Sequence, residues 1–287
     1  MTLPVHISDL ARLPWPFPDP EDAFTPVSGE DGAVGDLGSD YVEVMASRAA
    51  AFAADPGLLR LSSDTAPACW DAMLYLMGRL AADYPDSMEL HRDGTEYRWV
   101  NRLLGIDQDF LQGNSGTLPE HPLTFIGRQV PEDILLLTER DGALRLDAVP
   151  AAAGKPELAA TEWFLRPLTV DQVYRQMNWT FAQSDSGADA MVDAEWGRIR
   201  MRIEVEHLTR LPVTGALMVT TRSYTASLAD IATVAEWAEQ LADAVECLPA
   251  EVAASRGVDV VGAPVVAWLR AWAAATEETV AQGDSAA

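Results

Sequence analysis

The strongest constraint on the fold is a strictly alternating segment, RIRMRIEVEH, at residues 198–207. Apolar residues fall at every second position, and charged residues fall between them. The apolar set is Ile199, Met201, Ile203 and Val205. Successive side chains of a β-strand point to opposite faces of a sheet, so the pattern predicts a strand with one apolar face. Continuing the alternation places His207 on that apolar face.

The region from about residue 124 to 225 reads as strands. DILLLTERDGALRLDAV, residues 133–149, is two apolar runs joined through Asp141-Gly142, which is a strong hairpin signal. QVYRQMNWTFAQ predicts a further strand. ALMVTTRSY predicts another, and LTRLPVTG connects it to the alternating segment. Residues 196–224 are therefore expected to form antiparallel neighbours.

Helical patterns flank these strands on both sides. One helix is expected after Ser39 and a second after Asp64-Thr65, with Pro67 in its first turn. A third follows an apolar stripe over residues 231–245, and a fourth begins at Ala263-Pro264. Helices, then antiparallel strands, then helices predict the α+β class.

The predicted organisation has three parts. Residues 1–38 are rich in Pro and Gly and are expected to form an extended arm, since Pro excludes a helix there. Residues 39–282 are expected to form a single α+β domain, and residues 283–287 a frayed tail.

Composition excludes several classes of function. The chain has 287 residues and a formal charge of −24, which repels phosphate backbones and anionic membranes, so no nucleic acid or membrane partner is expected. It shows neither a signal peptide nor a long apolar span, which predicts a cytoplasmic protein. Cys69 and Cys247 are isolated and are expected to be buried apolar residues. Motifs for nucleotide-binding loops, serine hydrolases and zinc proteases are absent from the sequence.

The four histidines are scattered along the chain. His6, His91 and His121 are expected to be surface residues. His207 differs because it falls on an apolar strand face, where its nitrogens need a carbonyl, a carboxylate or a metal as partner. Taken alone, its position favours a hydrogen-bonded core or strand-end histidine over a metal ligand. A β-bulge before it would reverse its orientation.

The segment RIEVEHLTRLPVTGALMVTTRSY resembles the signature of the haem-dependent oxidative N-demethylase family, R-x-E-R-Q-T-L-x-R-L-P-x-[ST]-G-A-[x]-F-T-I-R-T-Y, with one more residue after Ala216 here than the pattern shows. The matching positions are Arg202, Glu204, Leu208, Arg210, Leu211, Pro212, Thr214, Gly215, Ala216, Thr220, Arg222 and Tyr224. Two shorter blocks are similar to further family segments. They contain Val130, Glu132, Asp133, Leu135 and Leu137, and then Arg175, Asn178 and Trp179.

The resemblance implies a PAS-like haem domain, in which an antiparallel sheet flanked by helices binds haem b on one face. It also implies O₂-dependent N-demethylation of a small secondary amine, which releases formaldehyde. Electrons would come from NAD(P)H through a separate flavin reductase partner.

Two departures from the family pattern bear on haem binding. The family's E-R-Q-T-L reads EVEHL at residues 204–208, so a histidine has entered the motif. A family segment I-H-x-P-V-P, expected between the block at residues 130–137 and the block at residues 175–179, is missing together with its histidine. If that histidine serves the haem in the family, either His207 replaces it or haem binding is lost.

The predicted site centres on His207 as the axial ligand of the haem iron, because haem needs a ligand of this kind in an apolar pocket. Arg202, Arg210 and Arg222 suit the propionates, since guanidinium pairs bidentately with carboxylate. The alternative for these arginines is cross-strand ion pairing, and alternation points Arg202 away from His207. Arg175, Asn178 and Trp179 are candidates for the pocket lining; for Asn178 and Trp179, simple strand packing is equally consistent with the sequence.

The functional hypothesis is a haem-dependent oxidoreductase that uses O₂ to oxidise a small amine or amino-acid-like metabolite, as a monooxygenase-type tailoring enzyme of specialised metabolism. Its catalytic residues are not identifiable from the sequence. The alternative is a non-catalytic PAS-like module that binds a small ligand or a partner subunit. A third hypothesis keeps the fold and replaces haem by metal-free chemistry.

Overall fold

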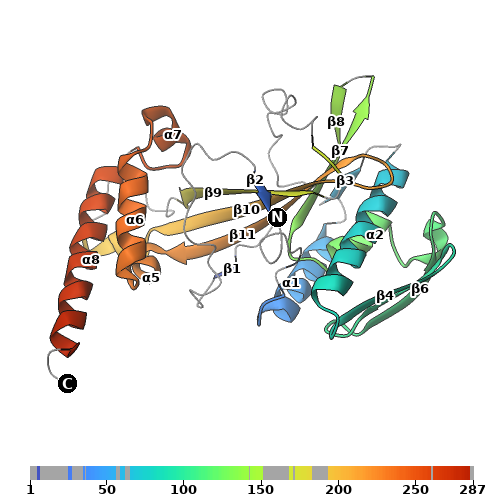
Figure 1. Ribbon diagram of the computed structural model, residues 1–287, viewed down its shortest axis with the longest axis horizontal. Helices are drawn as coiled ribbons and strands as arrows, with labels where there is room; N and C mark the ends of the chain where they lie inside the picture. Colours follow the sequence, from blue (N-terminus) through green and yellow to red (C-terminus); the bar gives the residue numbers. More distant parts are fainter. Residues whose placement is uncertain are drawn as a thin grey trace. The chain divides into compact units, whose positions relative to one another are not determined.

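A computed structural model of the chain describes residues 5–6, 25–27, 35, 37–55, 59–61, 65–141, 143–150, 168–170, 172–182, 193–259 and 261–284 (Figure 1). The helices are α1 (Tyr41–Ala54), α2 (Ala66–Asp83), α3 (Pro122–Gly127), α5 (Leu228–Ala232), α6 (Ala235–Glu246), α7 (Ala250–Ser255) and α8 (Gly262–Asp284). Short 3₁₀ turns cover Ser115–Thr117 and Asp193–Arg198.

The strands form two sheets. They are β1 (Val5–His6), β2 (Thr25–Val27), β3 (Leu59–Leu61), β4 (Met88–Asp93), β5 (Glu96–Asn101), β6 (Ile106–Leu111), β7 (Asp133–Arg140), β8 (Ala143–Pro150), β9 (Val173–Ala182), β10 (Arg200–Arg210) and β11 (Leu217–Ser227). The larger sheet has the order β2-β9-β10-β11-β7-β8-β3, and β1 pairs with β11; the smaller has the order β4-β5-β6. The predicted α+β class is confirmed, whereas the PAS-like arrangement stays a prediction.

The predicted hairpin at Asp141 is present. β7 and β8 pair antiparallel, and Asp141 adopts a left-handed backbone with a φ of 54°. Asp tolerates this conformation better than most residues, which is why the dipeptide Asp-Gly signals such turns. The predicted strands over residues 172–183, 198–207 and 216–224 are confirmed as β9, β10 and β11, and β10 continues three residues into the predicted connection, to Arg210.

The β4–β6 sheet corrects the prediction that strands begin near residue 124. Its inward side chains Tyr97, Trp99 and Phe110 are buried, and β4 packs against α2. The outward positions of these strands are strongly charged, which masks the apolar pattern that would predict them. Their sequence signal is Asp93-Gly94, the same turn dipeptide as Asp141-Gly142.

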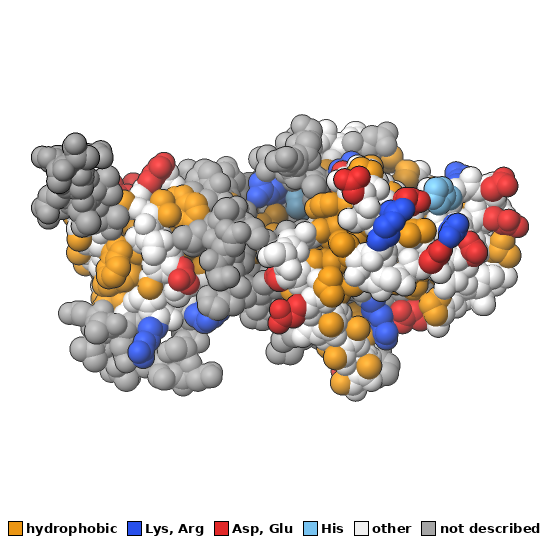
Figure 2. All heavy atoms as spheres, turned by 90° about the horizontal axis from the view of Figure 1, so that it is seen from below, with side chains coloured by type: hydrophobic (Ala, Val, Ile, Leu, Met, Phe, Trp, Pro, Cys, Tyr) orange, Lys and Arg blue, Asp and Glu red, His pale blue; other side chains and the backbone are white. Residues whose placement is uncertain are grey.

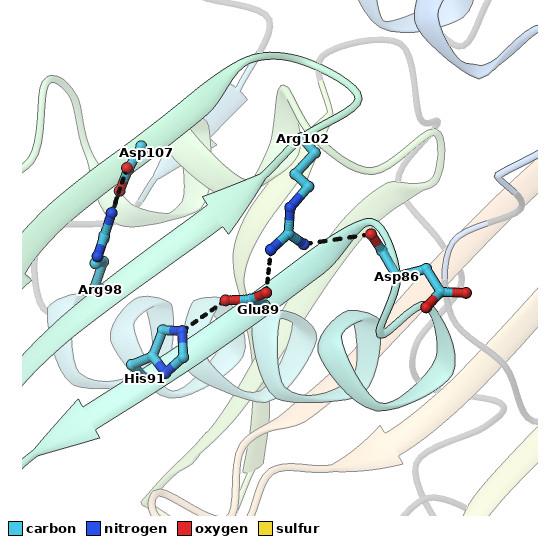
Figure 3. Close-up of polar contacts among 6 residues, drawn as sticks. All are labelled: Asp86, Glu89, His91, Arg98, Arg102 and Asp107. Carbon is cyan, nitrogen blue, oxygen red and sulfur yellow. Dashed lines mark hydrogen bonds and ion pairs between the residues drawn. The ribbon is translucent and has the colours of Figure 1, made fainter.

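Charged side chains pair with one another on the outer face of this small sheet (Figure 3). Arg98 forms an ion pair with Asp107 at 2.6 Å, while Arg102 and His91 both bind Glu89. Figure 2 likewise shows acidic and basic side chains close together on the described surface. Solvent screens exposed pairs of this kind, so they contribute little to stability.

The fold divides into two compact units. Unit 1 comprises residues 1–3, 24–176 and 206–222, and unit 2 comprises residues 4–23, 177–205 and 223–287. β10 and β11 each contribute residues to both units. The single domain expected over residues 39–282 stays a prediction.

A buried polar network ties the core of unit 1 together. The Tyr41 hydroxyl donates to the Gln129 carbonyl at 2.7 Å and accepts from the Asn101 amide at 3.1 Å. The Trp99 indole donates to Gln129 Oε1 at 2.7 Å. Burial raises the pKa of Tyr41 to about 12. The network joins α1, β5 and the segment after α3, which are far apart in the sequence.

Helices α6 and α8 pack side by side in unit 2 (Figure 1). The helix expected over residues 231–245 is split, because Val234 is extended and acts as the N-cap of α6. The preceding helix α5 starts at a capping box, in which Ser227 and Asp230 satisfy each other's backbone amides. Two helix starts therefore replace the one that was predicted.

Several smaller expectations are also resolved. Cys69 is buried as predicted, but Cys247 is exposed, because it lies at the C-cap of α6, where the helix ends. Helix α8 extends to Asp284, and residues 285–287 lie outside the described part of the chain, as does most of the predicted N-terminal arm. In the described part, no helix is long and apolar enough to cross a membrane.

Candidate functional site

His207 lies half-buried on β10, in unit 1. The alternation of β10 continues beyond it: Leu208 packs with Leu217 in one cluster, while Leu211 packs with Met218 in the main core of unit 1. Odd and even positions thus still face opposite ways. His207 therefore shares a face with Leu211, as the sequence pattern predicts.

β11 contributes polar residues to the same face. The hairpin is closed by the Leu211 amide, which donates to the Ala216 carbonyl at 2.8 Å. Four residues away from this bond along each strand, His207 of β10 lies opposite Thr220 of β11. Thr220 is 1% exposed, and its hydroxyl has no hydrogen-bond partner among the described residues. A buried hydroxyl without a partner is uncommon in proteins.

Arg222 lies two residues further along β11, on the same face as Thr220. It is 2% exposed, and its Nη1 donates to the Pro131 carbonyl at 3.4 Å. Thr209 on β10 is also buried. Unit 1 thus carries an imidazole, a buried guanidinium and two hydroxyls on one face of a strand pair.

Arg202 belongs to the opposite face and to unit 2. It forms an ion pair with Glu204 at 2.6 Å and donates to the Ser223 hydroxyl at 3.2 Å. The ion pair lies within β10, and the hydrogen bond to Ser223 crosses to β11, so the cross-strand ion pairing given as the alternative stays a prediction. Arg202 is not brought together with His207.

Arg210 is engaged by backbone carbonyls. Its Nε donates to Leu168 O at 2.7 Å and its Nη1 donates to Gly215 O at 2.8 Å. By alternation it faces away from His207. Its contacts stabilise the turn between β10 and β11 instead.

The predicted pocket residues on β9 fall into both units. Arg175 is half-buried and pairs in register with Thr25 of β2. Trp179 is 2% exposed in the core of unit 2, and the Arg256 guanidinium lies 4.7 Å from its ring centroid. Asn178 Oδ1 accepts from the Trp179 amide at 2.9 Å. For Asn178 and Trp179, these contacts match the strand-packing alternative.

The other histidines have separate environments. His91 is exposed as predicted and contacts Glu89. His121 is not an exposed loop residue: it is half-buried at the N-cap of α3, where its Nδ1 accepts from the Leu123 amide at 3.3 Å. Burial lowers its pKa. His6 is on β1, and its side chain lies outside the described part. Within the described ranges, no three His, Cys, Asp or Glu residues gather as a metal site.

A cavity of about 680 Å³ lies in unit 1, between α2, the inner face of the β4–β6 sheet and the β10–β11 turn. Its lining includes Trp70, Asp71, Tyr75, Arg92 and Tyr97. None of the residues predicted for the haem lines this cavity.

Asp71 was not singled out in the sequence, yet it anchors this region. Its Oδ2 accepts from the Val213 amide at 3.1 Å, and from both the amide and the hydroxyl of Thr214 at 2.7 Å. The signal for it is a carboxylate within the apolar run CWDAMLYLM of a helix.

A family model described as haem-dependent oxidative N-demethylase, alpha subunit-like matches residues 33–154 and 147–266. The chain belongs to this family. The match in sequence confirms the resemblance inferred from the three motif blocks. The family name links the chain with haem and oxidative N-demethylation at a general level.

The motif of this demethylase-like family has a structural role in the β10–β11 turn. Its Pro-x-[Ser/Thr]-Gly-Ala part is residues 212–216, and Thr214 binds Asp71 through two donors. Gly215 has a φ of +69°, which glycine adopts without strain. Residues 151–167, within the stretch where the family's additional histidine is expected, lie outside the described part of the chain.

Proposed function

We propose that the chain binds haem b on the His207 face of β10 and β11 and oxidises a small amine or amino-acid-like metabolite with O₂. The observation that carries the proposal is the face itself, in a chain of the demethylase-like family. This face carries the His207 imidazole, the buried Arg222 guanidinium and the buried Thr220 hydroxyl, which has no hydrogen-bond partner among the described residues.

These residues fit a haem by their chemistry. Imidazole is a common axial ligand of haem iron, and a buried guanidinium suits a propionate. Arg222 is the arginine best suited to this role, since it lies on the His207 face, whereas Arg202 and Arg210 lie on the other face. The proposal therefore keeps His207 and Arg222 at the centre. It gives no direct role in holding the haem to Arg202, Arg210, Arg175, Asn178 and Trp179.

The role of the protein is to hold and orient the haem and to exclude water from it. When bound, haem supplies the chemistry by which O₂ is activated. His207 would hold the group from the sheet side, and Arg222 would neutralise a carboxylate. Leu211 and Met218, both in the unit 1 core, would keep the neighbouring face dry.

Oxidative N-demethylation requires electrons from outside. A secondary N-methylamine, O₂, two electrons and two protons would give the primary amine, formaldehyde and water. We propose that an NAD(P)H/flavin reductase supplies the electrons. The alpha-subunit-like description of the family supports a partner subunit of some kind.

The altered motif supports a changed substrate. Val205, Glu206 and His207 replace the family's Arg, Gln and Thr within one strand. A tailoring step on a specialised metabolite is the role that we propose.

The test is the release of formaldehyde from N-methylated amines and amino acids by haem-loaded protein, with O₂ and a chemical or enzymatic electron donor. The proposal expects formaldehyde to match the amine consumed and to require O₂. It also expects His207→Ala to reduce the rate by at least about a hundredfold. Haem-loaded protein that consumes no amine across such a panel would contradict the proposed oxidation.

A further inference from the structure

The cavity beside α2 contains a carboxylate that is only partly satisfied. Asp71 is 5% exposed and lines the cavity. Its Oδ2 accepts three hydrogen bonds from residues 213 and 214, whereas its Oδ1 has no hydrogen-bond partner in the described part of the chain. The carboxylate is therefore held firmly on one side and open to a cationic or hydrogen-donating group on the other.

Arg92 brings the opposite charge to the same cavity. It lies at the end of β4, where its guanidinium lies 5.5 Å from the centroid of the Tyr97 ring and its Nε donates to the Gly94 carbonyl at 3.1 Å. Its two terminal nitrogens have no hydrogen-bond or ion-pair partner among the residues that the structure describes. No ion pair joins Arg92 to Asp71 in that part of the chain either.

The wall between these charges is apolar and aromatic. Trp70 and Tyr97 line the cavity, and their rings are held in place by Phe110, whose ring centroid lies 5.5 Å from that of Tyr97 and 5.9 Å from that of Trp70. Leu74 and Tyr75 of α2 continue the wall. Aromatic rings favour organic cations over sodium or ammonium, because methyl groups bury apolar area while the ring faces attract the charge.

We propose that this cavity binds a small zwitterion, with a methylated ammonium group at Asp71 and a carboxylate at Arg92. Two opposite charges that do not pair with each other, across an aromatic wall, complement a ligand that carries both charges on an apolar body. A volume of about 680 Å³ lies in the range of sites for small organic molecules. The binding step is independent of the proposed oxidation, since none of the haem candidates lines this cavity.

The experiment measures binding to the purified full-length chain by titration calorimetry. The probes are N,N-dimethylglycine, 3-(dimethylamino)propanoate and 4-(dimethylamino)butanoate, which differ only in the distance between their charges. Two kinds of controls each remove one charge. The carbon isosteres isovalerate, 4-methylpentanoate and 5-methylhexanoate lack the ammonium, and N,N-dimethylethylammonium lacks the carboxylate.

The proposal expects saturable binding of at least one zwitterion, at least about tenfold tighter than its carbon isostere and than N,N-dimethylethylammonium. If none of the three zwitterions binds saturably, or if an isostere binds as tightly as its zwitterion, the proposal is overturned. This outcome does not depend on any variant being folded.

Variants then assign the two charges. Arg92→Gln should weaken the zwitterion about tenfold while leaving N,N-dimethylethylammonium unchanged. Arg98→Gln, on the neighbouring strand and paired with Asp107 on the outer face, is the matched control and should change neither (Figure 3). Asp71→Asn should weaken the binding of the zwitterion and of N,N-dimethylethylammonium alike. Equal effects of the two arginine variants would refute the assignment of Arg92.

Discussion

Asp71 stabilises the β10–β11 turn, because one of its carboxylate oxygens accepts hydrogen bonds from three donors of that turn. Asp71→Ala leaves these donors without their acceptor, and we expect it to lower the free energy of unfolding by about 1–3 kcal/mol. Urea denaturation followed by circular dichroism measures the change. Asp107→Ala, which removes an exposed ion pair with Arg98, is the control and should have little effect. Equal losses in the two variants would contradict this role.

Tyr41 should titrate later than ordinary tyrosines. Burial raises its pKa to about 12, so in the folded protein its hydroxyl keeps its proton when an unfolded tyrosine has lost it, near pH 10. The folded state then binds more protons than the unfolded state, and stability falls as the pH rises from about 10 to 12. Tyrosinate absorbance during an alkaline titration should show this late step. If Tyr41→Phe, compared over the pH range where both proteins are folded, retains the step, the assignment is wrong.

At the scale of elements, the start of α3 depends on an uncharged imidazole. His121 Nδ1 accepts from the Leu123 amide, and burial lowers the pKa of His121. The unfolded state therefore takes up the proton first, and the contribution of His121 to stability is lost as the pH falls below about 6.5. Thermal melts at pH 7 and 5.5 should show a smaller decrease for His121→Asn, which keeps a capping acceptor but does not titrate. A decrease as large as that of the wild type would contradict this account.

The end of α7 is fixed by a close backbone approach to β9. Gly257 has a φ of +69°, and a Cβ there would lie 2.9 Å from the carbonyl oxygen of Phe181. The backbone amide of Phe181 donates a hydrogen bond to the Arg256 carbonyl, which holds the two segments close together. Gly257→Ala should therefore cost about 3 kcal/mol of unfolding free energy, since backbone strain and a clash add together. Gly94→Ala, with a φ of +61° and open space around it, isolates the backbone strain and should cost about 1 kcal/mol. Chemical denaturation that gives the same cost for both would disprove the clash.

At the scale of the whole molecule, the elements that follow from local sequence patterns could be predicted, whereas the long-range contacts could not. Alternation located β10 and the face of His207, and Asp-Gly located the β7–β8 hairpin. Charge pairs on the outer face of β4–β6 concealed that sheet, because its outward residues dominate the pattern. No periodicity could pair Asp71 with Thr214, since 143 positions separate them. Membership of the demethylase-like family confirms the resemblance, which rested on the motif around the β10–β11 turn.

The molecule as proposed is a haem protein in which His207 is the axial ligand of the haem iron. Titration of the purified chain with haemin, followed by Soret absorbance, tests this claim most directly. We predict saturation at about one haem per chain, with a spectrum that shifts on reduction and on addition of carbon monoxide. His207→Ala should alter the spectrum and weaken haem binding, while His91→Ala, an exposed histidine on β4, should do neither. A chain that stays colourless in excess haemin, or a His207→Ala variant whose spectra match those of the wild type, would contradict the account.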